Sequence, residues 1–312
     1  MPVRNRRSKK RIRYNVLKRT KLPLLRLTIL SFVVVLLFIL VGIFVKPGKW
    51  DGTSKLHMVV NKTDGNIELL VFDPQLQEIA AITIPGNTQV EVAGGLGIWK
   101  LGSVWELGKQ ENVDGELLAR TLTKELSLPV FVWSESQAES LTTVNAVKLI
   151  SYIIDPFKTN LTFKDKVKLA FFSIRTPNNK KIKVDLATSG YLKSTVLKDG
   201  EVGYVVTGKL PNNLLTLLVF PQISEKKIIT TLVNKSGDVG IAGKMSLVVE
   251  VLGSKVVSFE NEPPEDSGCE ISGVDQVAVK LMADTFYCKV GKEKEKQNEI
   301  KITIGTQYLN KF

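Results

Sequence analysis

The sequence has few of the side chains that bind transition metals or act as general bases. It contains one histidine, His57, and two cysteines, Cys269 and Cys288. No CxxC, HxxxH, Walker, GxGxxG or GxSxG pattern occurs, which excludes zinc sites, nucleotide loops and hydrolase elbows of the familiar forms. No metal site is therefore predicted. His57 stands at the start of a strand-like segment, where a lone histidine is more often structural than catalytic.

Acidic residues are absent from positions 1–26, which carry eleven lysines or arginines. Charge of either sign is then absent from residues 27–45. A helix of that length rises about 28 Å, close to the hydrocarbon thickness of a bilayer. These absences predict a basic cytoplasmic tail (1–26) and a transmembrane anchor (27–45). By the positive-inside rule, a connector (46–54) and all later residues lie outside the cell membrane.

Two other interpretations of the apolar run fit less well. A buried core helix rarely has so long a run without a polar face, and a cleaved signal peptide has a shorter apolar region and a small-x-small cleavage site. Beyond the run, 32 basic and 31 acidic residues remain, so nearly all of the net charge of +12 belongs to the tail. Because the tail adjoins the predicted anchor, we expect it to bind anionic lipids and not nucleic acid.

The two cysteines lie in the predicted extracytoplasmic part, where disulfides form. They bracket a predicted helix of about 20 Å, which is too long for a bridge between its two ends. A disulfide between Cys269 and Cys288 is predicted, provided that the chain around Cys269 runs back beside 288–290. Free thiols are the alternative.

Residues 55–221 are expected to form an α/β sandwich. Two apolar runs, 67–73 and 78–85, are joined at the Asp73-Pro74 turn and have the pattern of strands buried on both faces. The remaining predicted elements are an edge strand at 89–93, an irregular segment at 94–108 anchored by Trp99 and Trp105, helices at 114–126, 134–154 and 162–175, and strands at 129–133, 180–187, 201–208 and 214–220.

Local signals place the starts of these helices. Asp114 is expected to cap the first, and the boxes Ser134-x-x-Gln137 and Thr162-x-x-Asp165 are expected to begin the other two. One apolar stripe is expected to form the buried side of the second helix, and it consists of Leu141, Val144, Val147, Ile150 and Ile154.

Residues 225–312 read as a smaller β-α-β-α-β domain. Its predicted elements are strands at 226–233, 254–259 and 299–305 and helices at 241–252 and 274–287. The turn LVNKSGDVGIAG at 232–243, followed by a helix and SKVVSFEN, resembles the opening of the LytR C-terminal domain. That resemblance covers about 85 residues and implies a cell-envelope protein.

The larger domain resembles the LytR-CpsA-Psr catalytic domain. The stretch VFDPQLQEIAAITIPGNTQVEVAGGLGIWKLGSVWELG at 71–108 has the family's D-P turn, I-P-x-x-T frame and glycine-aromatic segment. In active members, the Arg and Asp after I-P hold a lipid-linked pyrophosphate with Mg²⁺. Here Gly86 and Asn87 occupy those positions, and the earlier G-x-D-x-R motif is reduced to Asp64. The resemblance therefore implies the family's fold with a degenerate catalytic motif, and no catalytic residue is carried over.

These observations predict a single-pass membrane protein with extracytoplasmic domains that binds or scaffolds at the cell wall, at peptidoglycan or at lipid-linked glycopolymer precursors. Trp99, Lys100 and Trp105 are the candidate ligand contacts, with plain packing as the alternative, and no cofactor is expected. A second hypothesis is an active glycopolymer transferase that uses Asp64, Asp73 and Lys100 with Mg²⁺. A third is a structural membrane protein whose tail binds a cytoplasmic partner or DNA.

Overall fold

The computed structural model describes residues 30–31, 47–143, 145–292 and 296–312. The chain divides into two units, Met1–Lys46 and Pro47–Phe312. The predicted tail, and the predicted anchor apart from Leu30 and Ser31, lie outside the described residues. Among the residues that are described, no helix is long and apolar enough to cross a membrane. The sheets and their helices all belong to the second unit.

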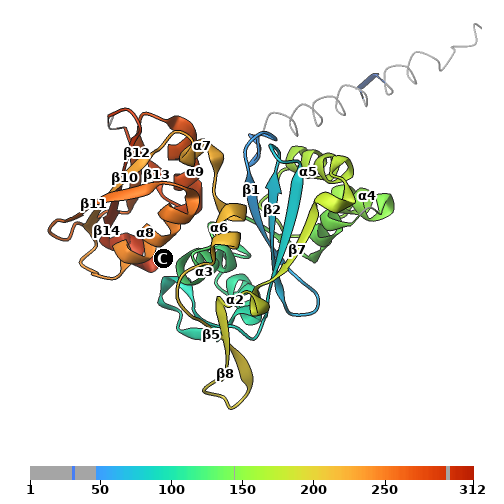
Figure 1. Cartoon of the computed structure of the whole chain (residues 1–312), viewed down its shortest axis with the longest axis horizontal. Coiled ribbons are helices and arrows are strands. Elements are labelled where there is room, and N and C mark those ends of the chain that lie inside the picture. Colours follow the sequence, from blue (N-terminus) through green and yellow to red (C-terminus); the bar gives the residue numbers. More distant parts are fainter. Residues whose placement is uncertain (1–29, 32–46, 144, 293–295) are drawn as a thin grey trace, which may run out of the picture. The chain divides into compact units, whose positions relative to one another are not determined.

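The first sheet of this unit has five strands in the order β6-β1-β2-β3-β7 (Figure 1). The central three pair antiparallel, and β6 and β7 add parallel at the two edges. The turn between β2 and β3 is the predicted one, since the Asp73 carboxylate accepts the N–H groups of Gln75 and Leu76 at 3.0 and 3.2 Å. The strands are β1 (Leu56–Asn61), β2 (Ile67–Asp73), β3 (Glu78–Ile84), β6 (Val132–Glu135) and β7 (Lys181–Asp185).

Helices cover both faces of this sheet. Every residue of β2 is buried, and its side chains alternate between two cores. Leu69 and Val71 belong to a core with α2 (Val104–Gln110), α3 (Glu116–Leu126) and α6 (Asn212–Leu218). Leu70 and Phe72 face α4 (Ala146–Ile154) and α5 (Phe163–Arg175). The mixed α/β architecture and the two-sided burial of β2 are therefore confirmed.

The second sheet has its own core and the order β11-β10-β14-β12-β13. Only β12 and β14 pair antiparallel. Two predicted segments have the observed bounds, α8 (Ile241–Leu252) and β14 (Glu299–Gly305), whereas the predicted β-α-β-α-β order is wrong because it lacks β12 and β13. The domain boundaries at 55–221 and 225–312 stay predictions. The other elements are β10 (Ile229–Lys235), β11 (Lys255–Asn261), β12 (Cys269–Gly273), α9 (Gln276–Phe286) and β13 (Lys289–Val290).

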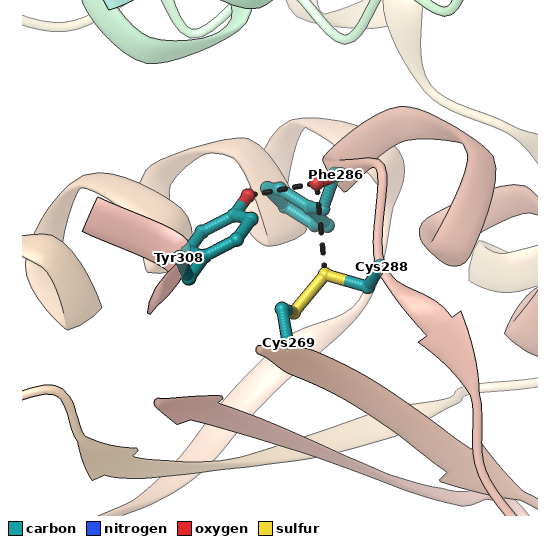
Figure 2. Close-up of a disulfide and its surroundings, with 4 residues drawn as sticks. All are labelled: Cys269, Phe286, Cys288 and Tyr308. Carbon is teal, nitrogen blue, oxygen red and sulfur yellow. Dashed lines mark hydrogen bonds between the residues drawn. A yellow bond between two sulfur atoms is a disulfide. The ribbon is translucent and has the colours of Figure 1, made fainter. Parts of the chain in front are cut away.

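The predicted disulfide is present between Cys269 and Cys288, whose Cα atoms lie 4.8 Å apart. Strands β12 and β13 pair in parallel from Glu270 and Lys289 onward, which brings the two cysteines side by side as the prediction required. In Figure 2 the bridge and the Tyr308 hydroxyl approach the same carbonyl, that of Phe286, and Tyr308 donates to it at 2.8 Å.

The glycine-aromatic segment 94–108 is more regular than predicted. β5 (Ile98–Lys100) pairs antiparallel with β4 (Gln89–Glu91), and α2 begins at Val104. Gly94, Gly95 and Gly97 adopt positive φ and reverse the chain between the two strands. No positive-φ residue occurs from Ile98 through Gly108, so the chain can continue as a strand and then a helix.

The predicted helix at 134–154 is wrong in its start and in its buried side. Ser134 lies in β6, a 3-10 helix spans Ser136–Thr142, and α4 begins only at Ala146. Asn145 is its cap and accepts the N–H groups of Val147 and Lys148 at 3.0 and 3.2 Å. Leu149 and Tyr152 face the sheet, whereas Val147, Ile150 and Ile154 are exposed. Of the rest of the predicted stripe, Leu141 is buried in the 3-10 helix, and Val144 lies outside the described residues. The sequence of α4 has apolar residues on two sides, and the side with the shorter stripe, Leu149 and Tyr152, packs against the sheet.

Three smaller predictions are also corrected. α3 begins at Glu116 without a side-chain cap, because the Asp114 carboxylate pairs with Lys158 at 2.6 Å. Residues 214–218 form most of α6 and not part of a strand, since Leu214 and Leu218 are buried one helical turn apart. β6 begins three residues later than predicted and ends two residues later. The capping box Thr162-x-x-Asp165 is confirmed in full.

The remaining elements are β8 (Leu192–Val196), β9 (Val202–Val206) and α7 (Pro221–Ser224), with short 3-10 helices at Ala93–Gly95, Leu101–Ser103, Asn178–Lys180, Leu186–Thr188 and Thr306–Asn310.

Candidate functional site

The turn after β3 contains Gly86, the position at which the resembled family has an arginine. The Gly86 N–H donates to the Asn66 side chain at 3.0 Å, and the Gly86 carbonyl accepts from the Gly102 N–H at 2.8 Å. A Cβ atom at position 86 would overlap the carbonyl oxygen of Gly65. The backbone of the β1–β2 turn therefore fills the space through which an arginine side chain would leave this position.

Asn87, at the family's aspartate position, connects the same turn to the β8–β9 hairpin. Its side-chain amide donates to the carbonyl of Val202 at 2.9 Å, and its own carbonyl accepts from the Tyr204 N–H at 3.3 Å. Thr88 forms an isolated bridge with Tyr204. Both backbone and side chain of Asn87 are thus used to hold the hairpin in place.

A shallow groove of about 250 Å³ lies next to this junction. It separates the β4–β5 pair from the connection between β8 and β9, and two predicted ligand contacts, Trp99 and Lys100, line it. The Trp99 side chain is 44% exposed, and its indole N–H donates to the carbonyl of Leu96 at 2.9 Å. An aromatic face is therefore presented to solvent in a fixed orientation. The lining residues are Gln89, Ile98, Trp99, Lys100, Leu197, Lys198 and Asp199.

Lys100 is already paired inside this groove. Its ammonium lies 2.7 Å from the Asp199 carboxylate and also pairs with Glu201. The hydrogen bond to Asp199, and then that to Glu201, raises the pKa of Lys100, and the same contact with Lys100 lowers the pKa of Asp199. With the second lysine of the groove, Lys198, two basic residues stand against the carboxylates of Asp199 and Glu201, so the groove has little net charge to offer to an anion.

Trp105, the third predicted contact, lies away from this groove. It is 1% exposed and packs edge to face on Trp133, with ring centroids 5.8 Å apart and an interplanar angle of 75°. The structure therefore brings Trp99 and Lys100 together at the groove. It places Trp105 in the core that contains Leu69 and Val71, as the packing alternative predicts.

The residues of the transferase hypothesis are not brought together. Asp64 precedes β2 and Asp73 ends it, so the length of that strand, about 20 Å, separates them. Asp73 is buried beside Lys55, at 3.0 Å. No group of three or more His, Cys, Asp or Glu residues within the described ranges could hold a metal ion. With Gly86 and Asn87 in place, these residues do not fit the family's magnesium–pyrophosphate arrangement.

Sequence reasoning placed β9 within the predicted strand at 201–208 but missed Asn66, Asp199, Glu201 and strand β8, and with it the β8–β9 hairpin. A signal for the hairpin is present, because Asp199-Gly200 is a turn dipeptide between two alternating runs, and Gly200 has a φ of 83°. No local signal identifies the hydrogen bond between Asn66 and Gly86, which joins residues 20 positions apart.

No protein-family model matches the chain. A search of curated proteins also found no match. Among solved structures, the chain is similar to Bacillus subtilis TagT, with 14% identity and a TM-score of 0.36 over 52% of this chain and 88% of that chain. For B. subtilis TagV the values are 9% and 0.36, over 51% and 92%. The B. subtilis LytR-CPS2A-psr family protein YwtF (TagT) with bound octaprenyl pyrophosphate lipid has 15% identity and a TM-score of 0.35 over 52% and 88%, and it belongs to the family that the sequence resembles.

Proposed function

We propose that this chain is a single-pass protein of the bacterial cell envelope, with its folded part outside the membrane, that binds glycopolymer at the cell wall without transferring it. The anchor at 27–45, the basic tail and the sequence resemblances to the LytR-CpsA-Psr and LytR C-terminal domains support the location. The larger region then has a binding role in place of the transferase role of its active relatives.

The observation that carries this proposal is the contact between Gly86 and the Gly65 carbonyl. An arginine clamp on a pyrophosphate needs a planar, doubly hydrogen-bonding cation at this position. In this chain the position lacks the side chain and also the space for one. Asn87 is likewise committed to the β8–β9 hairpin.

The groove beside the junction fits a neutral or weakly charged ligand. Lys100 in this groove already faces two carboxylates. A phosphate group would therefore compete with Asp199 and Glu201 for the Lys100 ammonium. The exposed indole of Trp99 and the neighbouring apolar side chain of Ile98 offer a surface for the apolar face of a sugar ring. Peptidoglycan strands or the sugar portion of a glycopolymer match this chemistry.

Calorimetric titration tests the proposal. Full-length protein in nanodiscs is titrated with soluble peptidoglycan fragments and, separately, with a polyprenyl pyrophosphate analogue with and without Mg²⁺. We expect the glycan to bind, and Trp99→Ala to weaken this binding at least tenfold. Leu76→Ala changes an even more exposed apolar residue, at the β2–β3 turn, and is expected to have no effect.

Magnesium-dependent binding of the pyrophosphate analogue would contradict the proposal and favour the transferase hypothesis. In that case, transfer of lipid-linked glycan that is abolished by Asp64→Asn would identify the activity. Glycan binding that is equally strong in Trp99→Ala would remove the groove from consideration as the site.

A further inference from the structure

The two helices on one face of the first sheet carry apolar residues on both of their sides. Leu149 and Tyr152 of α4, and Leu169 and Ala170 of α5, belong to the core beneath them. A second set of residues on the same helices is between 40% and 75% exposed, and it consists of Val147, Ile150, Ile154, Phe163, Val167, Phe171 and Ile174.

These exposed residues form one stripe on each helix. The α4 positions are spaced by three and four residues, and the α5 positions by three and four as well. At about 100° per residue, each stripe lies roughly opposite the buried side of its own helix. α4 and α5 contact each other and lie on the same side of the sheet (Figure 1). We call this outward surface the α4–α5 face. An exposed apolar surface of this extent indicates a partner.

Positive charge accompanies the face. Residues 146–175 contain six lysines or arginines and two acidic residues. Two of the six bond elsewhere, since Lys158 pairs with Asp114 and Lys168 donates to backbone carbonyls, and the other four are Lys148, Lys164, Lys166 and Arg175. One of the acids, Asp165, is buried and accepts hydrogen bonds from backbone N–H groups. Arg175 lies over the ring of Phe171, with its guanidinium carbon 3.9 Å from the ring centroid. Long basic side chains that cover apolar surface and end at its border are typical of segments at a membrane interface.

The chain enters the compact unit beside the same helices. The N–H groups of Lys49 and Trp50 donate to the Asp165 carboxylate at 2.9 and 3.2 Å, at the start of α5. The Lys168 ammonium donates to the carbonyls of Trp50 and Asp51 at 2.9 and 3.0 Å. If the anchor ends at residue 45, the four residues to Lys49 span at most about 14 Å. The predicted anchor is therefore joined by a short stretch of chain to the residues that bond to α5.

We propose that the α4–α5 face lies on the outer surface of the membrane, with its apolar stripes among the lipid headgroups and its basic residues on anionic phospholipid. The proposal rests on the predicted anchor at 27–45 and not on the glycan-binding function. Its physical basis is the combination of apolar stripes, net positive charge and the short connection from the anchor to α5. Such docking would orient the whole compact unit relative to the membrane.

Site-directed fluorescence tests this orientation in the full chain. The two native cysteines are paired, so single cysteines introduced as Ile150→Cys and Ile174→Cys can be labelled with bimane. Val202→Cys and Val257→Cys are matched controls, because both positions are exposed valines on strands away from the face. In vesicles of phosphatidylcholine and phosphatidylglycerol containing doxyl-labelled lipid, we expect at least twofold stronger quenching at positions 150 and 174 than at the controls. Equal quenching at all four positions would overturn the proposal.

A second measurement uses lipid affinity. Every residue of the three cores lies in 50–312, so residues 47–312 can be prepared without the anchor. We expect this fragment to sediment with vesicles rich in phosphatidylglycerol, and the triple variant Val147→Ser, Ile150→Ser, Ile154→Ser to bind at least tenfold more weakly. The matched triple variant Leu76→Ser, Val202→Ser, Val257→Ser should bind as the unmodified fragment does. If the first variant keeps its vesicle affinity, or instead converts a dimer to a monomer in sedimentation velocity, the face contacts something other than lipid and the proposal fails.

Discussion

The α-carbon of Gly86 lies so close to the carbonyl oxygen of Gly65 that no side chain can be attached to it without moving the backbone. Gly102, which bonds to Gly86, approaches the same oxygen, and a Cβ atom there would lie 2.6 Å from it. Three turns therefore meet backbone to backbone at the position where the resembled family binds pyrophosphate.

Restoring the family's arginine should for this reason destabilise the protein and not activate it. We expect Gly86→Ala to lower the free energy of unfolding by about 2 kcal/mol and Gly86→Arg by more, through overpacking. Gly243→Ala is the matched control, because a Cβ atom there meets nothing within 4 Å, and alanine stabilises a helix interior by up to about 1 kcal/mol. Urea unfolding measures both. A Gly86→Arg protein that is as stable as the original would contradict this close packing of the three turns.

The two tryptophans that the sequence grouped together should differ sharply. Trp105→Ala removes a fully buried ring and is expected to cost about 3–5 kcal/mol of unfolding free energy. Trp99→Ala removes a half-exposed ring at the groove and should cost less than about 1 kcal/mol. Thermal unfolding compares them. Similar losses for both would show that Trp99 is a packing residue, and its assignment to a ligand site would fall.

What could be predicted from the sequence depended on how local the signal was. β2 and the Asp73-Pro74 turn are encoded within seven or eight adjacent residues, and the capping box before α5 within four. The phase of α4 was wrong because two apolar sides compete for the core, and only the neighbouring elements decide between them. The exposed stripe that resulted is the feature on which membrane docking is proposed.

The candidate site was predicted in part for the same reason. Gly86 and Asn87 were identified by comparison with a family motif. The contacts that favour glycine and asparagine at these positions are made with Gly65 and Val202, which are distant in sequence. The partner of Lys100 is 99 residues away at Asp199. Contacts of this kind carry no periodicity, so sequence patterns could place Lys100 near the site but could not show that its charge is already neutralised.

His57 should make the protein sensitive to acid. Its ring is fully buried against Phe220, Nδ1–H donates to the Pro129 carbonyl at 2.8 Å, and Nε2 has no partner among the described residues. Burial lowers the pKa of His57 from 6.5 to about 3. Between these values the unfolded chain binds a proton that the folded protein excludes, so stability falls as the pH decreases through this window.

The expected size of this effect is about 2 kcal/mol between pH 7 and pH 5, from the 1.5 pH units below the unfolded pKa. His57→Gln should lose that part of the pH dependence in urea unfolding at the two pH values. Phe220→Leu disturbs the same packing but keeps the imidazole, and it should retain the dependence. Parallel stability profiles for His57→Gln and the unmodified protein would instead mean that the pKa of His57 is the same in the folded and the unfolded chain.

Lys55 and Asp73 form an ion pair beneath the surface, at 3.0 Å and with 4% and 9% of their side chains exposed. Removing one partner leaves a buried charge without its counterion, which typically costs about 3–5 kcal/mol. We expect this loss for Asp73→Asn, which keeps a side-chain oxygen for the N–H groups of Gln75 and Leu76. Lys55→Met combined with Asp73→Asn should be more stable than either single variant in chemical denaturation. Strictly additive losses would mean that the two charges do not interact.

The disulfide should stabilise the second sheet because it closes a loop around α9. Cys269 and Cys288 are 19 residues apart, and a loop of this length corresponds to about 3 kcal/mol in the chain-entropy model. Replacing both cysteines by alanine should cost this amount and should make stability independent of dithiothreitol. Tyr308→Phe is the control for local packing, since it removes the hydrogen bond to the Phe286 carbonyl beside the bridge and should cost about 1 kcal/mol while leaving the response to reductant intact. Unfolding curves of the unmodified protein that do not change on reduction would show that the bridge adds nothing to the pairing of β12 with β13, whose hydrogen bonds would then suffice to hold the two cysteines together.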